Sequence, residues 1–238
     1  MRTAYTVFRN LYNVRKMTMK LVLASGSQRR RELLTMCGYD YEIIVSNADE
    51  TIDENDPESF VRALSFRKAK DVFDRLFAAG RRDFAVIGSD TVVAFQKEGG
   101  TKPVIIGKPK DAEDAVRILS MLSGKTHRVF TGVSVIADIP DENAAAQCSI
   151  REKAEIQTEC SITEVTFETL SPDEITDYVN SGDPLDKAGS YGIQGPFGMF
   201  VREIRGNYFT VIGMPIPVLY KMLKKIGILP HGFYERIE

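Results

Sequence analysis

A short segment near the beginning of the chain combines features that suit the binding of phosphate groups. An apolar run over residues 21–24 predicts a buried strand. Ser25 and Ser27, separated by a glycine, interrupt this run with small hydroxyl side chains, and a helical pattern follows at once. The free N–H groups of the first helical turn point back toward these hydroxyls, and the helix dipole makes that end positive. The segment therefore predicts an anion site.

Three consecutive arginines, Arg29, Arg30 and Arg31, stand in the first turn of the same predicted helix. Cations at this end oppose the helix dipole, so a sequence selected only for folding would favour Asp or Glu there. The arginines indicate that an external anion balances them, because planar guanidinium groups bind phosphate oxygens in pairs. A solvated basic turn is the alternative explanation.

Carboxylates that could hold a metal ion or activate water occur at two predicted strand ends. Asp90 follows the apolar run 84–88 at a break made of small residues, and Asp49 and Glu50 lie in a loop after another strand. Two converging carboxylates would suit a divalent cation, which prefers oxygen ligands. The alternatives are a turn aspartate bonded to its own backbone and an acidic pair on the solvated surface.

Four further polar residues are candidates for binding. Lys68 lies on a long predicted helix, where lysine is common, whereas Lys108 stands between a glycine and a proline that restrict its backbone. Gln194 belongs to a glycine-rich loop, residues 186–195, and carries a donor and an acceptor on one planar group, which suits the edge of a nucleobase. We interpret His127 as a packed or hydrogen-bonded residue rather than as a metal ligand.

The elements that must position these residues alternate between strands and helices, with hairpins mixed in, which predicts a layered α/β domain with a mixed sheet. Further strands are expected over residues 41–45, 84–88, 92–95, 104–106, 129–137 and 162–170, with a hairpin formed by 199–204 and 208–212. Helices are expected over residues 57–79, from a cap at Asp111 to 122, from a capping box at Ser171 to 180, and over 215–226.

The ends of the chain differ from its body. Residues 1–19 are basic and contain no acid, which predicts a loose extension or, alternatively, an organelle transit peptide. Residues 20–229 are expected to form one domain and 230–238 a tail. The polar stretch 141–158 predicts a protruding hairpin or a surface insert.

Composition excludes several classes of protein. The 238 residues carry 31 basic and 33 acidic side chains, a net charge of −2, which argues against a partner that is a nucleic-acid polymer. No apolar run is long enough to cross a bilayer, so no membrane partner is expected. The three cysteines form no Cys/His cluster, which argues against zinc and favours a reducing, intracellular compartment.

Over roughly residues 20–228 the chain resembles the Maf family of nucleoside triphosphate pyrophosphatases. The resemblance rests on seven segments that occur in the family's order: residues 23–30, the Asp49–Glu50 loop, residues 67–69, 88–92, 107–109, 122–127 and 186–195.

The resemblance implies an α/β fold similar to inosine triphosphate pyrophosphatase: an elongated mixed sheet flanked by helices, with two lobes around a deep groove. It also implies hydrolysis of a nucleoside triphosphate to the monophosphate and pyrophosphate with a divalent metal, Mg²⁺ or Mn²⁺. The loop at 186–195 is similar to that of the dTTP/UTP subgroup. A homodimer in the cytoplasm is expected, or an organellar protein if the leader is a transit peptide.

By the same resemblance, Asp90 is the general base, and catalysis further involves Glu50, Lys68 and Lys108. Glu50 and Asp90 are the expected metal ligands. Substrate binding is expected from Ser25, Ser27, Arg29, Arg30, Thr91 and Gln194, among which Arg29, Thr91 and Gln194 set base choice. The alternatives are a 7-methyl-GTP pyrophosphatase of the same fold and a nucleotide-binding regulator of cell division without catalysis.

Overall fold

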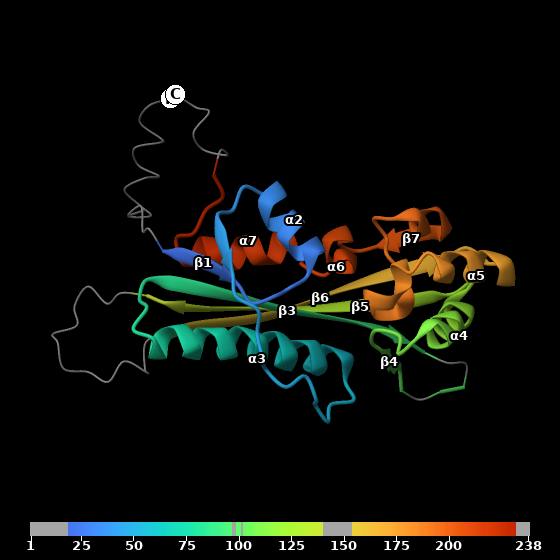
Figure 1. The fold of residues 1–238 in the computed structure, drawn as a ribbon, viewed down its shortest axis with the longest axis horizontal. Coiled ribbons are helices and arrows are strands. Elements are labelled where there is room, and N and C mark those ends of the chain that lie inside the picture. Colours follow the sequence, from blue (N-terminus) through green and yellow to red (C-terminus); the bar gives the residue numbers. More distant parts are fainter. Residues whose placement is uncertain (1–18, 97–98, 101, 140–153, 232–238) are drawn as a thin grey trace.

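The computed structural model describes residues 19–96, 99–100, 102–139 and 154–231, and one mixed sheet of seven strands runs through this part of the chain (Figure 1). Strand β1 pairs in parallel with β2 and β3, and the other pairs are antiparallel. The path through the sheet is β2 (Tyr41–Ile43), β1 (Lys20–Leu23), β3 (Phe84–Phe95), β5 (Thr126–Asp138), β6 (Ala154–Phe167) and β7 (Val201–Arg205), with β4 (Val104–Ile106) on β3.

Helices cover both faces of the sheet and one of its ends. Helix α3 (Pro57–Ala78) lies along one face, and α2 (Gln28–Met36), α6 (Tyr208–Ile212) and α7 (Ile216–Lys225) lie on the other (Figure 1). The end of the molecule is formed by α4 (Ala112–Leu122), α5 (Pro172–Asn180) and three short 3₁₀ turns, η2 (Asp183–Asp186), η3 (Ala188–Ser190) and η4 (Pro196–Phe200). The expected elongated mixed sheet flanked by helices is confirmed; the deep groove between two lobes stays a prediction.

The sheet is buried on both faces because successive side chains of a strand point in opposite directions. In β1, Leu21 and Leu23 pack in the core with residues of α2 and α7, whereas Val22 and the following Ala24 pack with residues of α3. A third core, built around Phe167, joins α4 and α5 to the far end of the sheet. The apolar run in β1 is therefore explained by burial on both sides.

Helix α3 lies unusually close to the two central strands at two glycines. A Cβ atom on Gly88 of β3 would lie 2.1 Å from the carbonyl oxygen of Ser65, and one on Gly132 of β5 would lie 2.1 Å from that of Val61. Only a residue without a side chain leaves room for the helix backbone at these points. The contact sets the height of α3 above the sheet.

The helix starts predicted at Asp111 and Ser171 are confirmed by their capping bonds. The side chain of Asp111 accepts a hydrogen bond from Asp114 N, and Ser171 forms the full capping box with Glu174. Asp56 caps α3 in the same way, with Pro57 in its first turn.

Two predictions of secondary structure were wrong. Residues 84–95 form the continuous strand β3, so Asp90 lies inside a strand and not at a strand end. The buried Ser89 hydroxyl is satisfied by a hydrogen bond to Gly132 O at 2.9 Å, so a polar residue can stand inside this strand. The expected hairpin 199–212 is a strand followed by helix α6, because the side chain of Asn207 caps the helix by accepting a bond from Phe209 N.

Three predicted segments lie mostly outside the described residues. They are the leader up to residue 18, the tail from residue 232, and residues 141–153 of the polar insert. Of the leader, the last residue, Met19, is buried. Of the tail, His231 N donates a hydrogen bond to Gly38 O. Residues 154–158 of the predicted insert belong to strand β6. Among the helices that the structure describes, none combines the length and the apolar character needed to span a bilayer.

Candidate functional site

The centre of the candidate site is an ammonium group between two carboxylates. Lys68 Nζ of α3 lies 2.6 Å from Asp90 Oδ1 of β3 and 3.0 Å from Glu50 Oε1 of the loop after β2. The side chains of Lys68 and Asp90 are 12% and 11% exposed, whereas that of Glu50 is 64% exposed. Three residues predicted for catalysis are thus brought together, and Glu50 lies at the solvent edge of the cluster.

The close contact between helix and sheet explains this geometry. Asp90 pairs with Gly132 across the β3–β5 ladder and points to the same face as Gly88, two residues earlier. Since both glycines admit the backbone of α3, Lys68 on that helix comes within hydrogen-bond distance of the Asp90 carboxylate. A glycine inside an apolar strand pattern is the sequence signal that could have predicted this approach.

The second cation of the site, Arg30, is held by three different elements. Its Nε donates to Gly213 O at 2.9 Å, Nη1 to Ser25 Oγ at 3.1 Å and Nη2 to Thr91 Oγ1 at 3.4 Å. Burial lowers the pKa of the Arg30 guanidinium and the charge of Arg29 adds to this, whereas the charges of Asp90 and Glu50 oppose it. Arg30 stays protonated at any ordinary pH, so it carries a permanent positive charge.

Two hydroxyl groups of the sheet share hydrogen-bond partners with Arg30. Ser89 Oγ donates to Gly213 O, the same carbonyl that binds Arg30 Nε. Thr91 Oγ1 lies 3.0 Å from Thr131 Oγ1 on β5. The carbonyl of Gly213 and the Ser89 hydroxyl were not predicted from sequence, because their role depends on α6 ending beside β3.

At the start of α2, Ser25 accepts a hydrogen bond from Ser27 N, and Ser27 occupies the N-cap position. The Ser27 side chain makes no capping bond to the helix. That an anion binds the free N–H groups at this helix start stays a prediction. Arg29 turns away from Arg30 and pairs with Asp186 at 3.2 Å, which links α2 to the glycine-rich loop. Asp186 is the first residue of the glycine-rich loop, and the sequence did not predict that it would pair with Arg29.

The loop that carries Gln194 rests on a rigid aromatic base. Tyr178 Oη donates to Asp183 at 2.5 Å and accepts from Gly192 N at 3.0 Å. Tyr191 is buried, and its hydroxyl lies 3.0 Å from His127 Nε2. Burial lowers the pKa of His127 to about 3, so the ring is neutral at physiological pH. The interpretation of His127 as a packed, hydrogen-bonded residue is confirmed.

Two candidates are not in contact with the central cluster. The side chains of Gln194 and Lys108 are exposed and form no hydrogen bond or ion pair with any other described residue. Lys108 follows Gly107, whose carbonyl accepts a bond from Gly189 N, so it is tied to the glycine-rich loop. That both side chains reach the same bound nucleotide stays a prediction.

The other acid of the loop, Asp49, forms a hydrogen bond with the loop backbone. Its Oδ1 accepts a hydrogen bond from Thr51 N at 2.8 Å, and the bonds from Thr51 hold the pKa of Asp49 below its ordinary value. The neighbouring Glu50 points to Lys68 instead. Only one acid of the predicted pair therefore joins the cluster.

The arrangement of Glu50 and Asp90 fits the chemistry of a divalent cation. Both carboxylates already converge on one positive group, and Mg²⁺ is commonly held by one or two carboxylates together with phosphates of the substrate. Within the described ranges no group of three or more His, Cys, Asp or Glu side chains could hold a metal by itself. The residues fit an ion that needs the substrate to complete its ligand set.

Comparison with known proteins identifies the family of the chain. The family described as Maf-like protein matches residues 20–226. A protein of Agathobacter rectalis named dTTP/UTP pyrophosphatase is 40% identical over 217 residues, covering 88% of this chain and 98% of that protein. A protein of the same name from Bacillus thuringiensis subsp. konkukian is 42% identical over 210 residues, covering 88% and 96%.

Among solved structures, the Ham1 protein of Staphylococcus aureus superimposes with a TM-score of 0.43 at 15% sequence identity, covering 87% of this chain and 98% of that one. The family match spans the start of α2, the cluster around Lys68 and the glycine-rich loop. With its matched segments and its relatives at 40% identity or more, the chain belongs to the Maf-like protein family.

Proposed function

We propose that this chain hydrolyses dTTP and UTP, and modified pyrimidine triphosphates of similar shape, to the monophosphate and pyrophosphate. The observation that carries the proposal is Lys68 held between Asp90 and Glu50, while Arg30 is fixed by bonds to Gly213 O, Ser25 and Thr91. Relatives that match nearly the whole chain bear the name dTTP/UTP pyrophosphatase, which supports this choice of substrate.

Cations at the site would bind the triphosphate and stabilise the charge that develops on the leaving pyrophosphate. Arg30 and the start of α2 offer donors to phosphate oxygens, and Lys68 and Lys108 add positive charge. A divalent cation held by Glu50 and Asp90 would neutralise phosphate charge and polarise the bond that breaks. These assignments rest on the chemistry of the side chains.

The hydrolytic step needs one base. Asp90 takes a proton from water as the water oxygen bonds to the α-phosphorus, and the bond from that phosphorus to the bridging oxygen breaks as pyrophosphate leaves. Lys68 holds the Asp90 carboxylate in position during this step. The exposed amide of Gln194 would pair with the adjacent carbonyl and N–H groups of a pyrimidine, and Arg29 and Thr91 would limit the size of the base.

Release of pyrophosphate from a panel of triphosphates tests the proposal directly. The panel contains dTTP, UTP, modified pyrimidine triphosphates and 7-methyl-GTP, each with Mg²⁺, with Mn²⁺ and with a chelator. We expect turnover of dTTP and UTP that depends on the metal. Nucleotide binding without pyrophosphate release would contradict the proposal and favour a non-catalytic regulator, and preference for 7-methyl-GTP would favour the other subgroup.

We also infer a homodimer that acts in the cytoplasm, which light scattering of the purified full chain and imaging of the tagged full chain would test. A monomer at micromolar concentration would contradict the first statement, and location in an organelle would contradict the second.

A further inference from the structure

The loop that carries Glu50 contains no helix or strand, yet Glu50 must keep its place beside Lys68. Between β2 and α3 the structure has no regular element over residues 44–56. The Glu50 side chain is 64% exposed, and its ion pair with Lys68 is the only hydrogen bond or ion pair that it makes with the described residues. An exposed ion pair contributes little by itself, so another contact must hold this segment.

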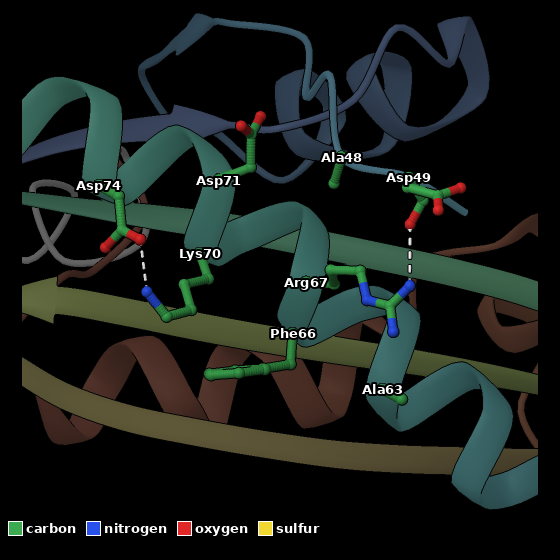
Figure 2. Close-up of a pocket in the computed structure, with 8 residues that line it drawn as sticks. All are labelled: Ala48, Asp49, Ala63, Phe66, Arg67, Lys70, Asp71 and Asp74. Carbon is green, nitrogen blue, oxygen red and sulfur yellow. Dashed lines mark hydrogen bonds and ion pairs between the residues drawn. The ribbon is translucent and has the colours of Figure 1, made fainter. Parts of the chain in front are cut away.

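That contact comes from Arg67, the residue directly before Lys68 on α3. Arg67 Nη1 donates to Asp49 O at 3.0 Å and to Thr51 O at 2.9 Å, the carbonyls on both sides of Glu50. Figure 2 shows the bond to Asp49. Successive side chains of a helix diverge by about 100°. The same helix turn thus holds the backbone of the loop with Arg67 and the Glu50 carboxylate with Lys68.

Further bonds fasten the first half of the loop to the same face of α3. Asp71 Oδ2 accepts from Ser46 Oγ at 3.0 Å and from Asn47 N at 2.8 Å, and Arg75 Nη2 donates to Val45 O at 2.9 Å. Arg67, Asp71 and Arg75 are spaced four residues apart, so they form one row along the helix. Arg67 is the member of this row that contacts the segment around Glu50.

We propose that Arg67 is a positioning residue for the pyrophosphatase reaction, acting through Glu50 by clamping the two peptide carbonyls that flank it. The inference rests on the proposed function, since it assigns to Glu50 a role in holding the metal and the phosphates. Residues that orient a ligand group change metal affinity or activity by about 10- to 100-fold when they are removed. Arg67 touches none of the reacting groups.

The matched control is Lys70. Together with Arg67 and Asp71 it lines a shallow depression of about 490 Å³ between the loop and α3. Figure 2 shows Lys70 paired with Asp74 on the helix, and it forms no hydrogen bond or ion pair with the loop among the described residues. Lys70→Ala therefore removes a positive charge from the same surface without releasing Glu50.

The first measurement is amide hydrogen exchange of the full chain without nucleotide. We expect Arg67→Ala to speed exchange over residues 48–52, while Lys70→Ala leaves it as in the wild type. Arg67→Lys keeps the charge but loses the planar fork, so exchange should lie between the two. Unchanged exchange in Arg67→Ala would overturn the clamp.

The second measurement is kinetic and uses a double-mutant cycle with Glu50→Gln. Arg67→Ala should lower kcat/KM and weaken the apparent affinity for Mg²⁺ by about tenfold or more, with melting temperatures compared to exclude unfolding. In the Glu50→Gln background the same change should cost less than about twofold, because the group it positions is gone.

Equal losses in both backgrounds would overturn the assignment to Glu50. If the wild type releases pyrophosphate from no triphosphate, the proposed function fails, while the exchange comparison still decides whether the clamp exists.

Discussion

The two halves of the candidate site are built in different ways. In one half, Lys68 of α3 and Asp90 of β3 project from regular elements that come together at Gly88, beside a second close contact of α3 at Gly132 of β5. The two side chains are almost fully buried. In the other half, the Gln194 side chain extends from the glycine-rich loop into solvent. The backbone of that loop is held at Gly192, whose N–H donates to Tyr178 Oη.

This difference suits two different tasks. A group that transfers a proton must be held within a fraction of an ångström, which a contact between helix and sheet can provide. A group that reads a base needs room to adapt to it, and a loop on the rigid Tyr178–Tyr191 base allows that. We expect changes in the first half to affect rate or folding and changes in the second half to affect selectivity.

The largest effect is expected from Asp90→Asn, which tests the rigid half. The amide keeps the size of the side chain but accepts no proton from water, so kcat should fall by at least about 100-fold. Calorimetry should show that the variant still binds dTTP. Asp53→Asn, an exposed loop carboxylate, is the control; turnover by Asp90→Asn close to the wild type would refute the assignment of the base.

Gly132→Ala tests whether the backbone contact sets the position of α3. The added methyl group would overlap Val61 O, so the variant should lose about 3 kcal/mol of unfolding free energy or more, measured by urea denaturation. Gly107→Ala, where a Cβ atom meets open space, should change little. Equal stabilities of the two variants would show that α3 can move away from the sheet without cost.

Gln194→Ala tests the adaptable half. Because the exposed amide has no partner among the described residues, its removal should leave stability unchanged. The ratio of kcat/KM for dTTP or UTP over other triphosphates should fall by about tenfold, which corresponds to the net free energy of one or two hydrogen bonds. Met199→Ala, another exposed change in the same region, should keep the ratio. A Gln194→Ala enzyme with wild-type selectivity would place base choice elsewhere.

The last prediction concerns the aromatic base of the loop, where no effect is expected at neutral pH. Since burial lowers the pKa of His127 from 6.5 to about 3, the unfolded chain binds one more proton than the folded chain between these values. The free energy of unfolding therefore decreases as pH falls through this window, by up to about 1.4 kcal/mol per pH unit from this residue. His127→Phe should show a shallower loss over the same range in urea titrations at several pH values. Identical slopes would mean that His127 is not held neutral.

Local signals were sufficient where the physical cause is local. Asp111 and Ser171 cap helices through bonds to residues three positions away, so spacing alone predicted them. The hairpin expected over 199–212 was wrong because Asn207 starts a helix at a point where the apolar pattern also suits a strand. The break expected at Asp90 was wrong because a carboxylate paired with Lys68 is tolerated inside a strand.

The amino-acid sequence by itself determined the family, the set of charged groups and the strand-to-helix turn at Ser25, because these depend on residue type and short-range spacing. The tertiary structure decided which acid of the pair at 49 and 50 meets Lys68, that Arg29 and Arg30 turn to different partners, and that Arg67 holds the loop from behind. The physical reason is that these contacts join segments between 16 and 183 residues apart, and only the packing of helix on sheet brings such segments together.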